Sequence, residues 1–171
     1  MPLRLLTHLL ALLLAILPAH AYAQDADAAA EAAVAQIVDP YDRLTPRASI
    51  TALLTALGEG DYNRAAQYLT VPLETDAQRA QAATLAQRLR TLLDSGGTLV
   101  PFGTLSNDPT GRTDDGLALE EEQIGELPIG DSNVPIILSR AALGEGDAAE
   151  VWRISPATVA QLATRQVAQV A

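Results

Sequence analysis

Carboxylates are the side chains that this sequence offers in greatest number for chemistry. Its 171 residues include 21 Asp and Glu against 11 basic residues, with two histidines and no cysteine. A pair of carboxylates that flank a sugar bond can serve as general acid and general base in glycoside hydrolysis. Aromatic side chains, which stack on sugars, make up only 4% of the chain. We therefore interpret the carboxylates as solvated surface charge rather than as a catalytic pair.

The densest acidic segment runs from Asp108 to Glu122, and its spacing can be compared with that of a calcium-binding loop. Its six carboxylates are Asp108, Asp114, Asp115, Glu120, Glu121 and Glu122. Aligning Gly116 with the sixth position of such a loop places Glu122 at the twelfth, where a glutamate is required. Gly111 and Thr113 then stand where carboxylate ligands belong. We predict a mobile acidic loop, with a weak accidental calcium site as the alternative, and no dedicated metal site.

The first 23 residues have the layout of a secretory signal peptide. A positive charge precedes a 13-residue apolar run over residues 5–17, and small residues follow it. We predict cleavage between Ala23 and Gln24, which places the protein in the periplasm. A cut after Ala21 and an uncleaved amino-terminal anchor are the alternatives.

Cleavage there would remove both histidines, His8 and His20, and would leave no lysine and no cysteine. Nucleophilic catalysis by Ser or Thr needs a base, commonly His or Lys. Zinc and copper sites favour His or Cys ligands, and a phosphate-binding P-loop requires a lysine. We therefore predict a non-enzymatic protein with no catalytic residues, no cofactor and no metal.

The charge of the exported part excludes two classes of partner. Removal of Arg4 leaves ten basic residues against 21 acidic ones, a net charge of about −11. Such a surface repels nucleic acid, whose binding depends on clustered cations, and it disfavours anionic lipid headgroups. After the signal peptide, no stretch approaches the ~18 consecutive apolar residues of a membrane span. The partners that remain are proteins and small molecules.

Residues 24–44 are rich in alanine and poor in large apolar side chains, so we expect a tether there. Residues 45–171 are expected to form a single domain that opens with three helices. Thr45 and Asp61 are good N-caps for the first two, which a short glycine-containing link joins into an αα-hairpin. The expected helices cover residues 46–57, 62–69 and 76–93. On the third, we expect Arg79, Arg88 and Arg90 to form the solvated side.

The pattern changes from helical to extended after Gly97. We expect a small antiparallel sheet of three to four strands, over residues 98–102, 122–129, 134–138 and 150–154, with Pro101 weakening the first. Trp152 is expected to be a core anchor. Ser155-Pro156 then starts a last helix with an apolar stripe at Val159, Leu162, Ala163, Val167 and Val170. This order of elements predicts an α+β domain.

The series of short motifs in residues 45–160 resembles one family. The motifs are Thr45-Pro46-Arg47, Gly60-Asp61-Tyr62, Ala65-Ala66, Tyr68-Leu69, Leu85-Ala86, Arg88-Leu89, Leu92-Leu93-Asp94, Leu105-Ser106-Asn107-Asp108-Pro109, Gly111, Asp115-Gly116-Leu117, Gly125, Val134-Pro135-Ile136, Trp152-Arg153-Ile154-Ser155 and Thr158-Val159. The series is similar to the exported amino-terminal region that precedes the membrane spans in some bacterial small-conductance mechanosensitive channels. It departs from that pattern after Val159, and no pore residue can be carried over.

The resemblance implies an extramembrane domain that acts through contacts with a membrane channel or another envelope protein. It leaves open whether the chain belongs to a longer channel or stands alone. The alternative hypothesis is a free-standing binding module for a small molecule, for which the acidic charge favours a cationic ligand.

Overall fold

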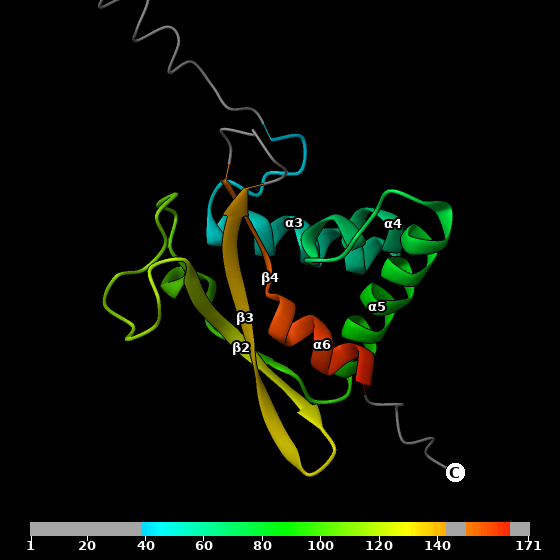
Figure 1. Ribbon diagram of the computed structural model, residues 1–171. Coiled ribbons are helices and arrows are strands. Elements are labelled where there is room, and N and C mark those ends of the chain that lie inside the picture. Colours follow the sequence, from blue (N-terminus) through cyan, green and yellow to red (C-terminus); the bar gives the residue numbers. More distant parts are fainter. Residues whose placement is uncertain (1–38, 143–149, 165–171) are drawn as a thin grey trace, which may run out of the picture. The chain divides into compact units, whose positions relative to one another are not determined.

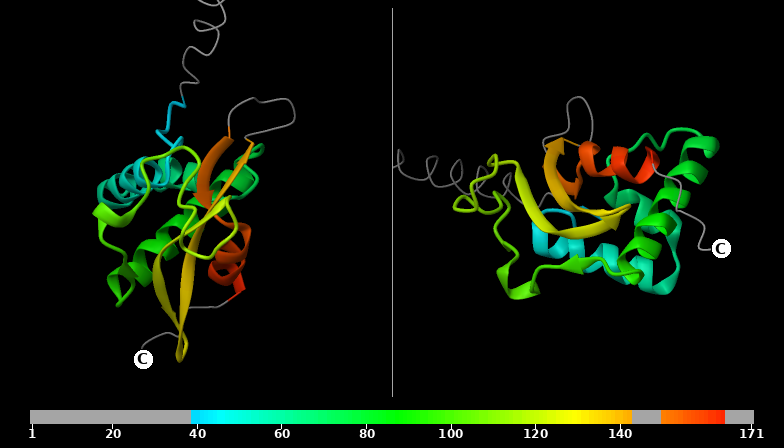
Figure 2. Two further views of the ribbon diagram at one scale, coloured as in Figure 1. Left: turned by 90° about the vertical axis from the view of Figure 1, so that its left-hand side faces the viewer. Right: turned by 90° about the horizontal axis from the view of Figure 1, so that it is seen from below.

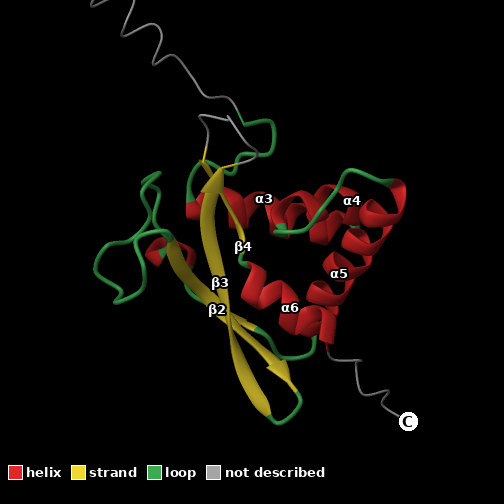
Figure 3. Cartoon of the chain, viewed as in Figure 1, coloured by secondary structure: helices red, strands yellow, loops and turns green. Residues whose placement is uncertain are grey.

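The computed structural model describes residues 39–142 and 150–164. The predicted cleavage site between Ala23 and Gln24 and the last predicted apolar positions, Val167 and Val170, lie outside the described residues. Helices and an antiparallel sheet form the described region, so the α+β class is confirmed (Figures 1 and 3).

Helix α3 (Pro46–Glu59) begins and ends at residues with clear capping chemistry. The Thr45 side chain accepts a hydrogen bond from the Ala48 amide, and Pro46 occupies the first helical position, where its missing amide costs nothing. Gly60 ends the helix with a φ of 74°, a left-handed conformation that glycine adopts without strain. The buried face of α3 then packs against the sheet and α5.

The segment after α3 is less regular than the expected helix over residues 62–69. Helix α4 (Tyr62–Ala65) is a single turn, and a 3₁₀ helix, η1 (Ala66–Tyr68), follows it. Leu69 leaves the helical conformation and bridges to Ile154 at the end of the sheet. The bridge to the sheet therefore replaces the last helical turn.

Two longer helices complete the helical layer, α5 (Asp76–Asp94) and α6 (Pro156–Thr164). A capping box starts α5: the Thr75 hydroxyl accepts from the Gln78 amide, and the Gln78 side chain accepts from the Thr75 amide. Helix α6 begins at Pro156, as expected, and packs against α5 and β3.

The sheet has four antiparallel strands in chain order: β1 (Thr98–Leu99), β2 (Glu121–Ile129), β3 (Ser132–Ala142) and β4 (Glu150–Ile154). It curls around helices α3, α5 and α6, which lie on one side of it (Figures 1 and 2). The first strand is shorter than the expected 98–102, because Pro101 cannot donate to the ladder and the 3₁₀ helix η2 (Phe102–Thr104) follows it. Strand β3 extends beyond the expected 134–138 at both ends.

The core lies between the curled sheet and the helices. Trp152 is fully buried there, which confirms it as a core anchor. The other large apolar side chains of the core are Ile50, Leu53, Leu57, Tyr68, Leu69, Leu85, Leu89, Leu105, Ile124, Leu127, Ile129, Ile136, Leu138, Ile154, Val159 and Leu162. Burial of this apolar surface supplies the main stabilisation, since the chain has no cysteine and so no disulfide.

Residues 39–44, which precede the expected domain start at Thr45, pack against the domain. Asp39 and Arg43 form a buried ion pair at 2.7 Å, with side chains 0% and 4% exposed. The Arg43 carbonyl accepts a hydrogen bond from the Trp152 amide, so this segment covers the free edge of β4. Residues 39–44 are therefore part of the folded unit and not of the tether.

Candidate functional site

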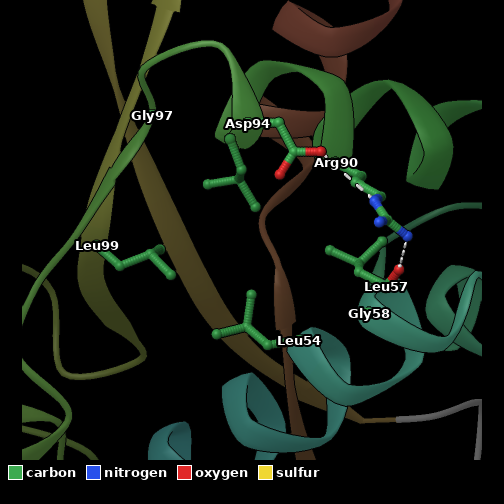
Figure 4. Close-up of a pocket in the computed structure, with 8 residues that line it drawn as sticks. Leu54, Leu57, Gly58, Arg90, Asp94, Gly97 and Leu99 are labelled. Atoms are coloured by element: carbon green, nitrogen blue, oxygen red, sulfur yellow. Dashed lines mark hydrogen bonds and ion pairs between the residues drawn. The ribbon is translucent and has the colours of Figure 1, made fainter.

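A cleft of about 330 Å³ opens between the carboxyl-terminal ends of α3 and α5 and strand β1 (Figure 4). We call it the leucine cleft. Its lining residues are Leu54, Leu57, Gly58, Arg90, Leu93, Asp94, Gly97 and Leu99. The volume lies at the lower end of the range typical of small-molecule sites.

The shape of the leucine cleft follows from the pattern of α3 and from a tight turn after α5. Leu57 packs into the core and is 3% exposed, whereas Leu54, one turn earlier on the same helix, is half-buried. Gly58 carries no side chain, and a Cβ added to it would have no neighbour within 4 Å. The α3 side of the cleft is thus an apolar wall beside an open space.

The polar side of the cleft is an ion pair on α5. The Arg90 guanidinium donates to the Leu57 carbonyl near the end of α3, and its Nε lies 3.5 Å from the Asp94 carboxylate (Figure 4). The Asp94 side chain is 71% exposed. An ion pair this exposed contributes about 0–1 kcal/mol, so the Asp94 carboxylate can exchange partners at little cost.

The expectation that Arg79, Arg88 and Arg90 are simply solvated is wrong for two of them. Arg79 is exposed, but Arg88 and Arg90 are half-buried. Arg88 donates to the Leu162 carbonyl on α6, and Arg90 to the Leu57 carbonyl on α3. Both guanidinium groups therefore tie neighbouring helices to α5, through contacts distant in sequence that a helical periodicity cannot reveal.

A second hollow, of about 430 Å³, runs along the outer side of α3, and most of the residues that line it are polar. It is lined by Asp42, Arg47, Ala48, Thr51, Ala52, Thr55, Arg64 and Asn107. One of its two arginines, Arg47, is already committed, because its guanidinium donates to the Leu105 carbonyl at 2.6 and 3.0 Å. The Thr51 and Thr55 hydroxyls donate to backbone carbonyls of their own helix. This hollow therefore offers fewer free contacts than its composition indicates.

Glu122 lies in a strand, as expected, but its side chain is not solvated as expected for the acidic cluster. It lies on β2, is 1% exposed, and its Oε1 accepts a hydrogen bond from the Ser106 amide at 2.9 Å. Its Oε2 is buried without a hydrogen-bond partner among the described residues. Burial raises the pKa of Glu122, and the Ser106 amide and Arg112 offset this rise only in part.

This burial predicts a pH-dependent stability. Because the pKa of Glu122 is raised on folding, the folded state holds its proton more tightly, and stability from this group falls as pH rises above the ordinary glutamate pKa. We expect Glu122→Gln to remove this component, so that unfolding free energies from urea titrations change less with pH above the ordinary glutamate pKa. Glu126→Gln, at a half-buried position on the same strand, is the control. A steeper decline in Glu122→Gln than in the unaltered protein would contradict the assignment.

The remaining candidates from the sequence do not form a site. Within residues 39–142 and 150–164, no group of three or more acidic, His or Cys side chains is placed to hold a metal ion. Among the described helices, none is both long enough and apolar enough to cross a bilayer. The leucine cleft was not predicted from the sequence. The signal for it is that two helices carry more leucines near their carboxyl-terminal ends than their core-facing sides require, and this signal is weak.

No protein-family model matches this chain, and neither a curated protein nor a solved structure does.

Proposed function

We propose that this chain is an exported, non-enzymatic binding module whose leucine cleft accepts the apolar part of a small ligand. The observation that supports this proposal is the cleft itself: four leucine side chains line an open volume beside one exposed ion pair. Apolar walls supply affinity, and a few polar groups orient the ligand, which is the usual composition of small-molecule sites.

The absence of His, Lys and Cys after the predicted cleavage site supports the non-enzymatic part of the proposal. The polar groups at the cleft are an arginine and one exposed carboxylate. Contact with a membrane channel or another envelope protein, which the resemblance implies, stays a prediction.

The proposal predicts that filling the cleft abolishes binding without unfolding the protein. In Gly58→Phe, no atom lies within 4 Å of the added Cβ, so the ring enters open space. The substitution also removes a glycine from a helix, where glycine lowers the stability by about 0.5–1 kcal/mol. We expect small amphipathic molecules, tested by thermal shift and titration calorimetry, to stabilise the unaltered protein but not Gly58→Phe.

The matched control is Ala80→Phe, which adds the same ring at an exposed position of α5. This control is expected to keep ligand binding. Equal binding by Gly58→Phe and the unaltered protein would show that the ligand site lies elsewhere, and a panel that stabilises neither would count against a small-ligand function.

A further inference from the structure

Two helices have their carboxyl-terminal ends at the leucine cleft. Helix α3 ends at Glu59, one residue after the cleft residue Gly58, and α5 ends at Asp94, which itself lines the cleft (Figure 4). The carboxyl end of a helix carries a partial charge of about −0.5. Neither helix has a basic residue in its last turn to offset that charge.

The charges at the cleft therefore sum to a negative value. The two helix ends and the Asp94 carboxylate contribute about −2, and Arg90 contributes about +1. Arg90 is also committed to the Leu57 carbonyl, which fixes its guanidinium against the end of α3. The Asp94 carboxylate is mostly exposed, and its contact with Arg90 Nε is long, at 3.5 Å. The carboxylate therefore remains accessible to a ligand.

We propose that the leucine cleft selects ligands with a cationic head group, an ammonium attached to a short apolar group. The ammonium lies at Asp94 and the helix ends, and the apolar group lies against Leu54, Leu57 and Leu99. The inference rests on the proposed function, since it names the ligand class of the same site. The chain's net charge of −10 adds a long-range attraction for the same ligands.

Three probes that share one apolar group and differ in their head group test the head-group inference separately from the proposed function. Hexylammonium, hexanol and hexanoate are titrated into the full chain, and affinities are measured by NMR or calorimetry. We expect hexylammonium to bind most tightly and hexanoate most weakly, with the hexylammonium affinity falling as salt screens the charges. Asp94→Asn is expected to weaken hexylammonium about three- to tenfold and to leave hexanol unchanged.

The control is Asp76→Asn, which neutralises an exposed ion-paired aspartate at the opposite end of α5. It is expected to leave all three affinities unchanged. If hexanol or hexanoate binds as tightly as hexylammonium and Gly58→Phe blocks that binding, the inference is overturned while the proposed function stands. An unchanged hexylammonium affinity in Asp94→Asn also overturns it. If no probe binds, the proposed function fails.

Discussion

Asp39→Asn is expected to destabilise the domain by about 3–5 kcal/mol, because it leaves the buried Arg43 guanidinium without its counter-charge. The two Asp39 oxygens accept from Arg43 Nε at 3.0 Å and Nη2 at 2.7 Å, and from the Arg43 amide at 2.6 Å. The guanidinium also donates to the Gln67 carbonyl. Removing the carboxylate charge therefore disrupts the segment that covers the edge of β4. Chemical denaturation of the folded chain measures the loss.

The exposed pair of Asp76 and Arg79 is the control for this loss. It has a similar separation, 2.6 Å, but the Asp76 side chain is fully exposed. Asp76→Asn is expected to have only a small effect, since water already solvates both charges. Replacing Asp39 and Arg43 together by apolar residues of similar size should recover part of the stability lost in Asp39→Asn. Equal losses in Asp39→Asn and Asp76→Asn would contradict the buried pair.

The contribution of Asp39 to stability is expected to depend on pH with a sign opposite to that of Glu122. Burial alone would raise the pKa of Asp39, but the hydrogen bonds and charge of Arg43 lower it below its ordinary value. Its stabilisation is therefore fully present above the ordinary aspartate pKa and is lost as pH falls through the lowered folded value. Asp39→Asn should accordingly show a weaker acid-induced loss of stability than the unaltered protein.

Gly111→Ala is expected to cost about 3 kcal/mol. Gly111 has a φ of 76°, and a Cβ there would lie 2.6 and 2.7 Å from two ring carbons of Trp152. The left-handed conformation costs an alanine about 1 kcal/mol, and displacing a buried ring adds about 2 kcal/mol. The indole cannot simply move aside, because its Nε1 donates to the Pro109 carbonyl at 3.0 Å.

Gly116→Ala isolates the contact from the backbone strain. Gly116 has nearly the same φ, 78°, but a Cβ there meets nothing within 4 Å. It should therefore cost only the conformational part, about 1 kcal/mol. Thermal or urea unfolding of both variants gives the difference. Equal losses at Gly111 and Gly116 would mean that the Trp152 contact contributes nothing.

Local signals in the sequence predicted the elements whose ends depend on local chemistry. Strand β4 covers the expected residues 150–154, and α6 starts at the expected Pro156, because a proline at the first turn and a run of β-forming residues act within a few positions. Strand β1 is shorter than expected, because Pro101 and the 3₁₀ helix after it end the strand instead of only weakening it.

The candidate site depends on contacts that no local pattern contains. Arg90 reaches the Leu57 carbonyl across 33 positions of sequence, and Glu122 meets the Ser106 amide across 16. A helical period identifies the face on which Arg90 lies, but it does not show that α3 ends beside that face. The burial of Glu122 likewise follows from the loop that folds back over β2. Both features appear only when the elements are packed.

The most direct test of the binding function is an NMR titration of the full chain with its leucine methyl groups labelled. The account predicts that hexylammonium shifts the methyl signals of the cleft leucines, Leu54, Leu57, Leu93 and Leu99, and that Gly58→Phe suppresses these shifts. Shifts confined to leucines away from the cleft, such as Leu127 and Leu138 in the core, or no shifts at saturating probe, would contradict it.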